Sequence, residues 1–141
     1  MIRQVQAEDW ERLRDARLRA LADAPCAFSS TLSREQAFED RVWQERATPR
    51  GSGASFAAEQ DGRFGAIASC FVAEDPTAVH LVGMWVAPEP RRGGVGLRLV
   101  DTTVNWARPR GAKRCGFGRT DPTPTLPYEP GAGADVLVLQ L

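Results

Sequence analysis

The stretch that decides the fold runs from Val79 to Arg110 and reads VHLVGMWVAPEP, then RRGGVG, then LRLVDTTVNWARPR. Residues 79–86 form a mainly apolar run that two prolines follow, which is typical of a buried strand. Glycines then gather where the chain turns. The last part predicts an amphipathic helix that stops at Pro109 and Gly111, with these apolar residues on the face that packs on the sheet: Leu97, Val100, Val104 and Ala107.

The turn between this strand and this helix has the properties of a phosphate-binding site. Glycines before a helix let backbone N–H groups point at a ligand from the positive end of the helix dipole. Arg91 and Arg92 add positive charge at the same place. A glycine-rich turn that binds no ligand is the alternative interpretation of these few positions.

Two common glycine motifs do not fit this turn. A Walker loop ends in Gly-Lys-Ser/Thr, whereas Leu97 and Arg98 follow the last glycine here. A Rossmann fingerprint follows a first strand and has an acidic residue about 20 positions further on, which this stretch lacks. What remains is R-x-x-G-x-G at residues 91–96. Together with the preceding MWVAPEP it resembles the acyl-coenzyme A loop of the GNAT family, the GCN5-related N-acetyltransferases.

The resemblance implies the fold and the reaction. We expect one domain over residues 1–141, of the α/β class, with a mixed central sheet flanked by helices. We expect an acetyltransferase that takes acetyl-coenzyme A as co-substrate and passes the acetyl group by direct attack to a primary amine of a small molecule or peptide. The residues that the resemblance implies for coenzyme A binding are Met84, Trp85, Val86, Arg91, Arg92, Gly93, Gly94, Val95 and Gly96.

The chain ahead of the deciding stretch has an order of elements that also matches the family. Alternating polar and apolar residues predict strands, and apolar residues at spacings of three and four predict helices. Asp61-Gly62 is a typical hairpin turn between two of the strands. The predicted order is strand, helix, helix, strand, strand, at residues 2–6, 8–24, 33–43, 54–59 and 64–73.

His80 is the candidate general base. Strict alternation along the strand predicts that it shares a face with Val82, Met84 and Val86. An imidazole can accept a proton near neutral pH, and in the family's histone-directed members a glutamate base lies the same distance before the loop. A histidine bonded to backbone or water, with a water chain as the base, is the alternative.

The other site residues come from loops. In the resembling family the first two helices wall the acceptor cleft, which would bring Phe28 and Ser29 to the substrate. Packing within the core is the alternative for Phe28. Tyr128, in a proline-rich loop near the C-terminus, is a candidate acid for the departing thiolate, with packing or acceptor contact as its alternative role.

Beyond the helix the sequence departs from the family pattern. A parallel crossover should return to a neighbouring strand, but 111–114 lead directly into Cys115-Gly116-Phe117 without an apolar run. The family has a fifth strand and a fourth helix between these pieces, and both are expected to be missing. Three explanations are open: residues absent from the given sequence, a true deletion in an inactive or remodelled protein, or a partner chain that fills the gap.

Composition excludes several other functions. The chain has 18 basic and 18 acidic residues, which does not favour nucleic-acid binding. Three separated cysteines and one histidine favour reduced thiols and no metal site. The absence of an apolar run of membrane-spanning length and of a signal-peptide pattern favours a cytoplasmic protein without a membrane partner. A homodimer is left open. The alternative function is a catalytically impaired acyl-coenzyme A-binding or regulatory module, which the missing segment would favour.

Overall fold

The computed structural model describes residues 1–28, 30–88, 93–117 and 137–140. The elements follow the predicted order, except that the second helical stretch is two short helices. In chain order they are β1 (Ile2–Gln4), η1 (Ala7–Asp9), α1 (Trp10–Asp23), η2 (Pro25–Ala27), α2 (Leu32–Gln36), α3 (Asp40–Ala47), β2 (Gly53–Gln60), β3 (Arg63–Val72), β4 (Ala78–Val86), α4 (Val95–Ala107), η3 (Arg108–Arg110), β5 (Arg114–Phe117) and β6 (Leu137–Gln140).

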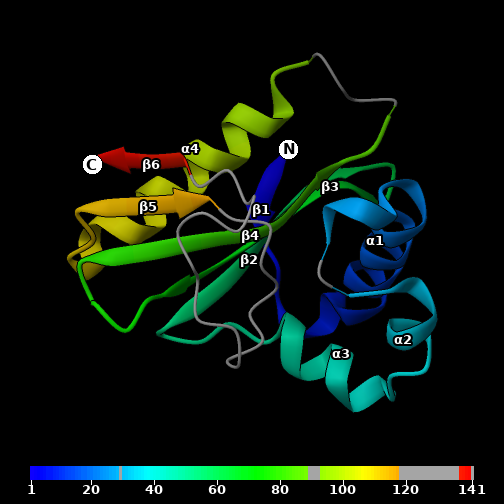
Figure 1. Ribbon diagram of the computed structural model, residues 1–141. Helices are drawn as coiled ribbons and strands as arrows, with labels where there is room; N and C mark the ends of the chain where they lie inside the picture. Colours follow the sequence, from blue (N-terminus) through cyan, green and yellow to red (C-terminus); the bar gives the residue numbers. More distant parts are fainter. Residues whose placement is uncertain (29, 89–92, 118–136, 141) are drawn as a thin grey trace.

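The strands form one mixed sheet in the order β1-β2-β3-β4-β5-β6. Neighbouring strands are antiparallel except for β4 and β5, which are parallel and joined through α4. In Figure 1, α1, α2 and α3 gather at one side of the molecule, and β5 and β6 lie at the other. The hairpin between β2 and β3 turns at Asp61 and Gly62, which both have positive φ, as the sequence predicted.

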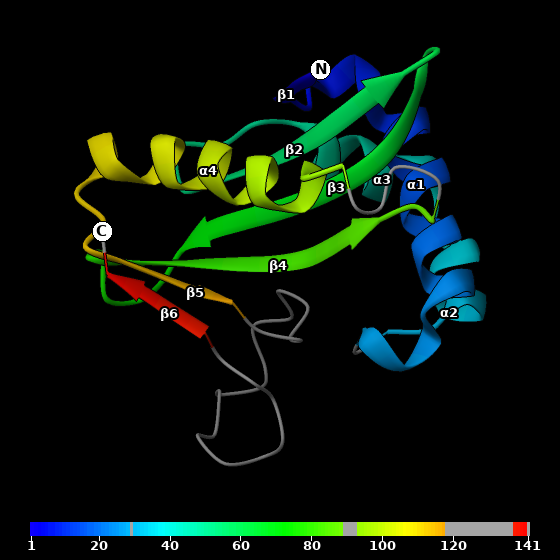
Figure 2. The same ribbon diagram turned by 90° about the horizontal axis from the view of Figure 1, so that it is seen from above.

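The two faces of the sheet carry separate apolar cores. On one face α4 packs on β2, β3 and β4, and the buried cluster includes Phe56, Leu81, Leu99 and Trp106. On the other face α1 packs on β3, and the second cluster includes Leu13, Ala16, Phe64, Ile67 and Trp85. Figure 2 shows α4 and α1 in these separate positions.

The helix α4 corrects one detail of the predicted packing. Val104 and Ala107 are buried and Val100 packs against the core, but Leu97 is 74% exposed. The helix begins at Val95, and its buried positions are Val95, Leu99, Thr103, Val104, Trp106 and Ala107. The apolar residues near its start surround the helix, so their spacing alone did not select the packed face.

The segment after α4 fills the gap that was expected in the sheet. A fifth strand is present: β5 pairs with β4 from Ala78↔Arg114 to Leu81↔Phe117. The expectation that this strand is missing was wrong. A strand of four residues can be held by backbone hydrogen bonds to its neighbours, so it does not need an apolar run. Lys113 and Arg114 both donate their N–H groups to the Thr77 carbonyl, which starts the pairing. The described residues contain no helix between β5 and β6, and 118–136 lie outside the description.

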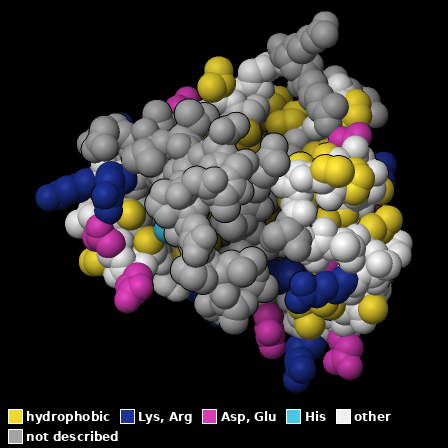
Figure 3. All heavy atoms as spheres, in the orientation of Figure 1, with side chains coloured by type: hydrophobic (Ala, Val, Ile, Leu, Met, Phe, Trp, Pro, Cys, Tyr) yellow, Lys and Arg dark blue, Asp and Glu magenta, His cyan; other side chains and the backbone are white. Residues whose placement is uncertain are grey.

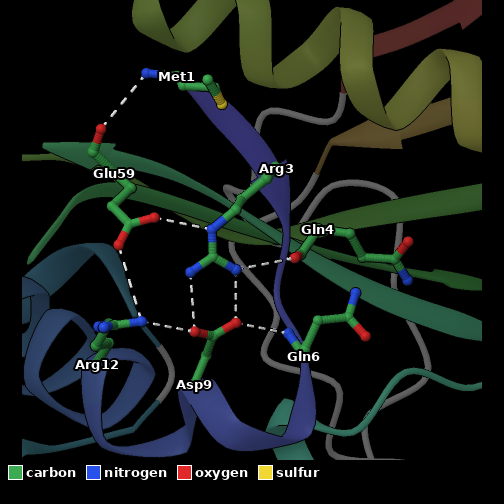
Figure 4. Close-up of polar contacts among 7 residues, drawn as sticks. All are labelled: Met1, Arg3, Gln4, Gln6, Asp9, Arg12 and Glu59. Atoms are coloured by element: carbon green, nitrogen blue, oxygen red, sulfur yellow. Dashed lines mark hydrogen bonds and ion pairs between the residues drawn. The ribbon is translucent and has the colours of Figure 1, made fainter. Parts of the chain in front are cut away.

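The short strand β1 is fixed by a charged network (Figure 4). Arg3 donates from Nη1 and Nη2 to the carboxylate of Asp9, at 2.6 and 2.9 Å, and from Nε to Glu59 at 2.9 Å. Arg12 donates to the same Asp9 at 3.0 Å. These pairs connect β1 to the start of α1 and to β2. Among the described residues, no helix has the length and apolar content needed to cross a membrane.

Candidate active site

The central strand β4 contains a β-bulge at Gly83 and Met84. Ser69 pairs with Val82 and Ile67 pairs with Trp85, so two residues of β4 lie opposite the single residue Ala68. Gly83 has φ +60°, a conformation that side chains other than glycine rarely adopt. Strict alternation of side chains along β4 therefore ends at Gly83.

Because of the bulge, the predicted distribution of side chains over the two faces of β4 is wrong. His80 and Val82 lie on the α1 side of the sheet. Met84 and Val86 lie on the α4 side, where their side chains are 3.7 and 3.9 Å from the Cβ position of Gly96. The extra residue moves every later side chain to the other face. His80 thus shares a face with Val82 but not with Met84 and Val86, contrary to the sequence prediction.

Among the described residues, no side chain caps the N-terminus of α4. Gly94 has φ +75° and is the N-cap residue. The first helical hydrogen bond runs from the Arg98 N–H to the Gly94 carbonyl at 3.1 Å, so residues 95–97 precede it and their N–H groups have no partner within the helix. The first turn has no acidic residue. Gly94, Val95 and Gly96 therefore form a helix start with no side-chain cap, whereas Arg91 and Arg92 lie outside the described residues.

Among the described residues, β4 has no strand partner on one edge at residues 82–85, which form its free edge. The pairing with β5 covers residues 78–81, whereas β4 continues to Val86. No described strand pairs with β4 beyond Leu81 on this side, and β4 runs on past the end of β5 (Figure 2). Met84 and Trp85 belong to this part of β4, and Val86, which has an interaction of its own, ends the strand.

His80 lies three residues before the bulge and beside β5. Its ring contacts that of Phe71, with the ring centroids 5.2 Å apart, and its backbone pairs with Phe71 and Gly116. Burial lowers the pKa of His80 below its ordinary value. The imidazole is therefore neutral near pH 7 and able to accept a proton. Ser29 and Tyr128, the other predicted acceptor and acid residues, lie outside the described residues.

A cavity of about 410 Å³ lies on the α1 side of the sheet and reaches the bulge. Helices α1, α2 and α3 and strands β2, β3 and β4 supply its walls. Phe28 is not among its lining residues but contacts Arg17, whose Cζ is 4.7 Å from the ring centroid. The lining residues that matter below are Arg17, Arg34, Phe38, Val42, Trp43, Glu45, Arg46, Arg50, Phe71, Val82 and Gly83.

A buried ion-pair cluster forms the inner wall of this cavity. Glu35 is fully buried and accepts hydrogen bonds from Arg17 Nε at 3.1 Å, Arg17 Nη2 at 3.0 Å and Arg46 Nη1 at 2.8 Å. Burial opposes ionisation of this carboxyl, but hydrogen bonds from Arg17, Ser30 and Arg46 outweigh it and lower its pKa. Arg17 also approaches the bulge, because its Nη1 is 3.3 Å from the Cβ position of Gly83.

Sequence reasoning missed this cluster. The three partners lie on different helices, 18 and 11 residues apart along the chain. No short motif connects them. Only the low exposure expected for residues on the inner sides of α1 and α2 could have indicated a pairing.

The cysteines do not contribute an activated thiol to the described site. Burial raises the pKa of Cys70 to about 12 and also raises the pKa of Cys115, while Cys26 is exposed. A thiol with a raised pKa is a poor nucleophile at neutral pH. Within the described residues, no group of histidines, cysteines and carboxylates has the arrangement of a metal site.

Comparisons with known proteins identify the family and the fold. The sequence model of the Acetyltransferase (GNAT) family matches residues 10–123. A search of curated protein sequences finds no match. Solved structures of similar fold include the PaiA N-acetyltransferase of Thermoplasma acidophilum in complex with coenzyme A, at 12% identity and a TM-score of 0.66, covering 84% of this chain and 77% of the other.

Two further solved structures have the same fold. An aminoglycoside acetyltransferase from an uncultured soil metagenomic sample, in complex with sisomicin, has 15% identity and a TM-score of 0.64, covering 83% and 75% of the two chains. A ribosomal-protein-alanine N-acetyltransferase of Brucella melitensis has 16% identity and a TM-score of 0.60, covering 88% and 82%. At these identities the likeness concerns the fold alone. The match of the family model over most of the chain, on this fold, shows that the chain belongs to the GNAT family of acetyltransferases.

Proposed function

We propose that the protein is an N-acetyltransferase that moves an acetyl group from acetyl-coenzyme A to a primary amine of a small molecule or peptide. The observation that carries the proposal is the bulge at Gly83. It lies on the free edge of β4, the strand that precedes the uncapped N-terminus of α4, and it borders a cavity that can hold an acceptor. Family membership and coenzyme A complexes among proteins of the same fold support the use of this co-substrate.

Coenzyme A would bind along one path. Its pyrophosphate would lie at the N-terminus of α4, where the N–H groups of residues 95–97 and the helix dipole favour an anion. Arg91, Arg92 and Gly93 would complete this part of the site. The amide groups of the pantetheine arm would pair with the free edge of β4 at Met84 and Trp85, as an added strand does. The thioester would then reach Gly83, about 10 Å along the strand from its end.

The reaction follows from this placement. The neutral amine attacks the thioester carbonyl carbon, a C–N bond forms and the C–S bond breaks. Backbone N–H groups of β4 at the bulge would stabilise the charge on the carbonyl oxygen. The proton of the amine passes to His80 through a chain of waters, because His80 lies about 10 Å from Gly83 along β4 and a single water would not span that distance. The thiolate takes a proton from water or from Tyr128.

Calorimetric titration tests the co-substrate. We expect acetyl-coenzyme A to bind and ATP not to bind, because the turn lacks the Lys-Ser/Thr of a nucleotide loop. Absence of coenzyme A binding would refute the proposal. Release of free thiol with a panel of amines then tests catalysis. Binding without turnover of any amine would favour a regulatory acyl-coenzyme A-binding module instead.

A further inference from the structure

The cavity beside β4 carries an excess of positive charge. Four arginines line it, Arg17, Arg34, Arg46 and Arg50, against one acidic lining residue, Glu45. Glu35 lies behind Arg17 and Arg46 and adds a second negative charge. Counted over the described residues, the formal charge at this site is therefore +2, although the whole chain is neutral. In Figure 3, basic side chains lie over the region of α3, close to hydrophobic ones.

Two of the four arginines hold their positive charge in fixed positions. Arg17 donates two hydrogen bonds to Glu35, and Arg46 donates one to the same carboxylate. Arg46 also lies against aromatic rings, with its Cζ 5.0 Å from the centroid of Phe38 and 5.1 Å from that of Trp43. The single carboxylate of Glu35 thus accepts hydrogen bonds from two guanidinium groups. It balances only one of their two charges, so the inner wall of the cavity keeps a positive charge.

The other two arginines are available to a ligand. Arg34, on α2, and Arg50, in the turn before β2, are exposed and line the cavity. Among the described residues, neither guanidinium group has a carboxylate partner within ion-pair distance. Arg50 pairs through its backbone with Gly53, Gly53 pairs with Phe71, and Phe71 pairs with His80. Arg50 thus lies on the same row of paired backbone positions as the candidate base.

The remaining wall of the cavity is mainly apolar. Its side chains come from α3, β3, β4 and the turn between α2 and α3: Phe38, Val42, Trp43, Phe71 and Val82. Such a wall favours an aliphatic or aromatic group on the acceptor. A polycationic amine would meet the like charge of four arginines and little polar surface that could replace its hydration.

From this arrangement we propose that the acceptor is an amino acid or a similar small amine that carries a carboxylate and an apolar side chain. Arg34 and Arg50 bind the carboxylate, and the apolar wall takes the side chain. The fixed charge of Arg17 and Arg46 adds attraction for the anion. The inference rests on the proposed function, because the cavity receives the acceptor only if the acetyl group is delivered at Gly83.

Matched pairs of amines test the proposal. Thiol release is measured with L-leucine, L-methionine and L-phenylalanine, with the carboxamide of each, and with spermidine and tobramycin. Each amide keeps the side chain and the amine but loses the negative charge. Its α-amino group is also the weaker base and is less protonated at neutral pH, so intrinsic reactivity favours the amide. We expect kcat/KM to be at least tenfold higher for the amino acids, the effect of a charged hydrogen bond.

Variants of Arg34 and Arg50 test whether these two residues cause the preference for a carboxylate. We expect Arg34→Met and Arg50→Met each to raise KM for the best amino acid by about tenfold, with kcat and KM for the amide little changed. Arg41→Met is the matched control, because Arg41 is an exposed residue of α3 that does not line the cavity. It should leave all these constants unchanged.

The outcomes separate this inference from the proposed function. Equal or better turnover of the amides, spermidine or tobramycin would overturn the inference and leave the N-acetyltransferase proposal intact. Turnover of no amine, with coenzyme A bound, would contradict the proposed function instead. Calorimetric titration of L-leucine and L-leucinamide into the coenzyme A complex then decides the inference, because preferential binding of L-leucine supports it and equal or absent binding overturns it.

Discussion

Gly83 shows how much one residue contributes to this site. Its backbone adopts φ +60°, its position forms the bulge, and the missing side chain leaves room for the guanidinium group of Arg17. These three properties coincide at the point where the cavity meets β4. A residue with a side chain would disturb both the strand and its contact with α1.

The substitution Gly83→Ala tests this double role. We expect a loss of about 1 to 2 kcal/mol of unfolding free energy from the positive φ, together with a large loss of turnover because Arg17 and the bulge must shift. Gly62→Ala is the control, since Gly62 has φ +74° and open space around its Cβ position. Denaturant unfolding and thiol release measure both effects. If Gly83→Ala keeps the activity of Gly62→Ala, the bulge does not position the acetyl group.

His80 gives a prediction about pH. Burial lowers its pKa below 6.5, so the neutral form persists to lower pH than in a free histidine. If His80 is the base, kcat/KM falls only as the pH drops through this lowered pKa. We expect His80→Ala to remove this part of the profile and to lower turnover near neutral pH, with coenzyme A affinity unchanged. Unchanged turnover would exclude His80 as the base.

Among the elements, α4 combines a structural and a binding role at its first turn. Leu97 is exposed and follows the N-cap Gly94 by three residues. The sequence predicted the glycine turn and the helix correctly, because both depend on local backbone preferences. It placed Leu97 on the wrong face, because burial depends on how the helix meets the sheet.

A carboxylate at Leu97 should separate stability from binding. In Leu97→Asp the negative charge near the positive end of the helix should raise the unfolding free energy by about 0.5 kcal/mol. The same charge should repel the pyrophosphate and weaken coenzyme A binding by about tenfold, with Leu97→Asn as the uncharged control. Thermal unfolding and calorimetry measure the two effects. Equal affinity of the two variants would argue against a phosphate at this helix end.

The strand β1 depends on Asp9 for its attachment. Asp9 accepts hydrogen bonds from Arg3, Arg12 and the Gln6 backbone, and these bonds, those from Arg3 first, hold the pKa of its carboxyl well below the ordinary range. The ionised form is therefore stabilised by folding. This contribution is complete above the unfolded-state pKa of about 4 and is lost as the pH falls below it.

We expect Asp9→Asn to lower the unfolding free energy by about 2 kcal/mol at neutral pH, the effect of losing charged hydrogen bonds. The difference from the unmodified protein should shrink as the pH falls below about 4, because Asp9 then becomes protonated in the unfolded chain while it stays ionised in the folded protein. Asp101→Asn, at an exposed position on α4, is the control. Denaturant titrations at several pH values measure this, and a difference that does not change with pH would contradict the assignment.

For the whole molecule, the thiols report on the mechanism and on the packing. Cys70 and Cys115 are buried with raised pKa values, whereas Cys26 is exposed. We expect iodoacetamide to modify only Cys26 in the native protein and all three cysteines after unfolding, as counted by intact mass. Acetyl transfer should survive the modification, because direct attack on the thioester needs no cysteine. Loss of activity that follows modification of Cys115 would contradict direct transfer.

The sequence was sufficient for the fold but not for the site. The family fold, the order of the elements and the glycine turn all follow from local patterns of apolar residues, glycine and proline. The bulge at Gly83, the pairing of Glu35 with Arg17 and Arg46, and the short β5 depend on contacts between distant segments. Those contacts decide which residues share a face with His80 and which charges line the cavity. The sequence alone could therefore predict neither.

The sheet also separates the parts of the molecule that can be redesigned independently. The helix α4 and its apolar cluster lie on one face, and the cavity with α1, α2 and α3 lies on the other. The exposed positions of residues 31–50 could therefore be randomised in a library without disturbing the core beneath α4, with the buried Glu35, Trp43 and Ala47 kept. Such variants would change which amine is selected, while a single coenzyme A affinity column would still recover every folded member.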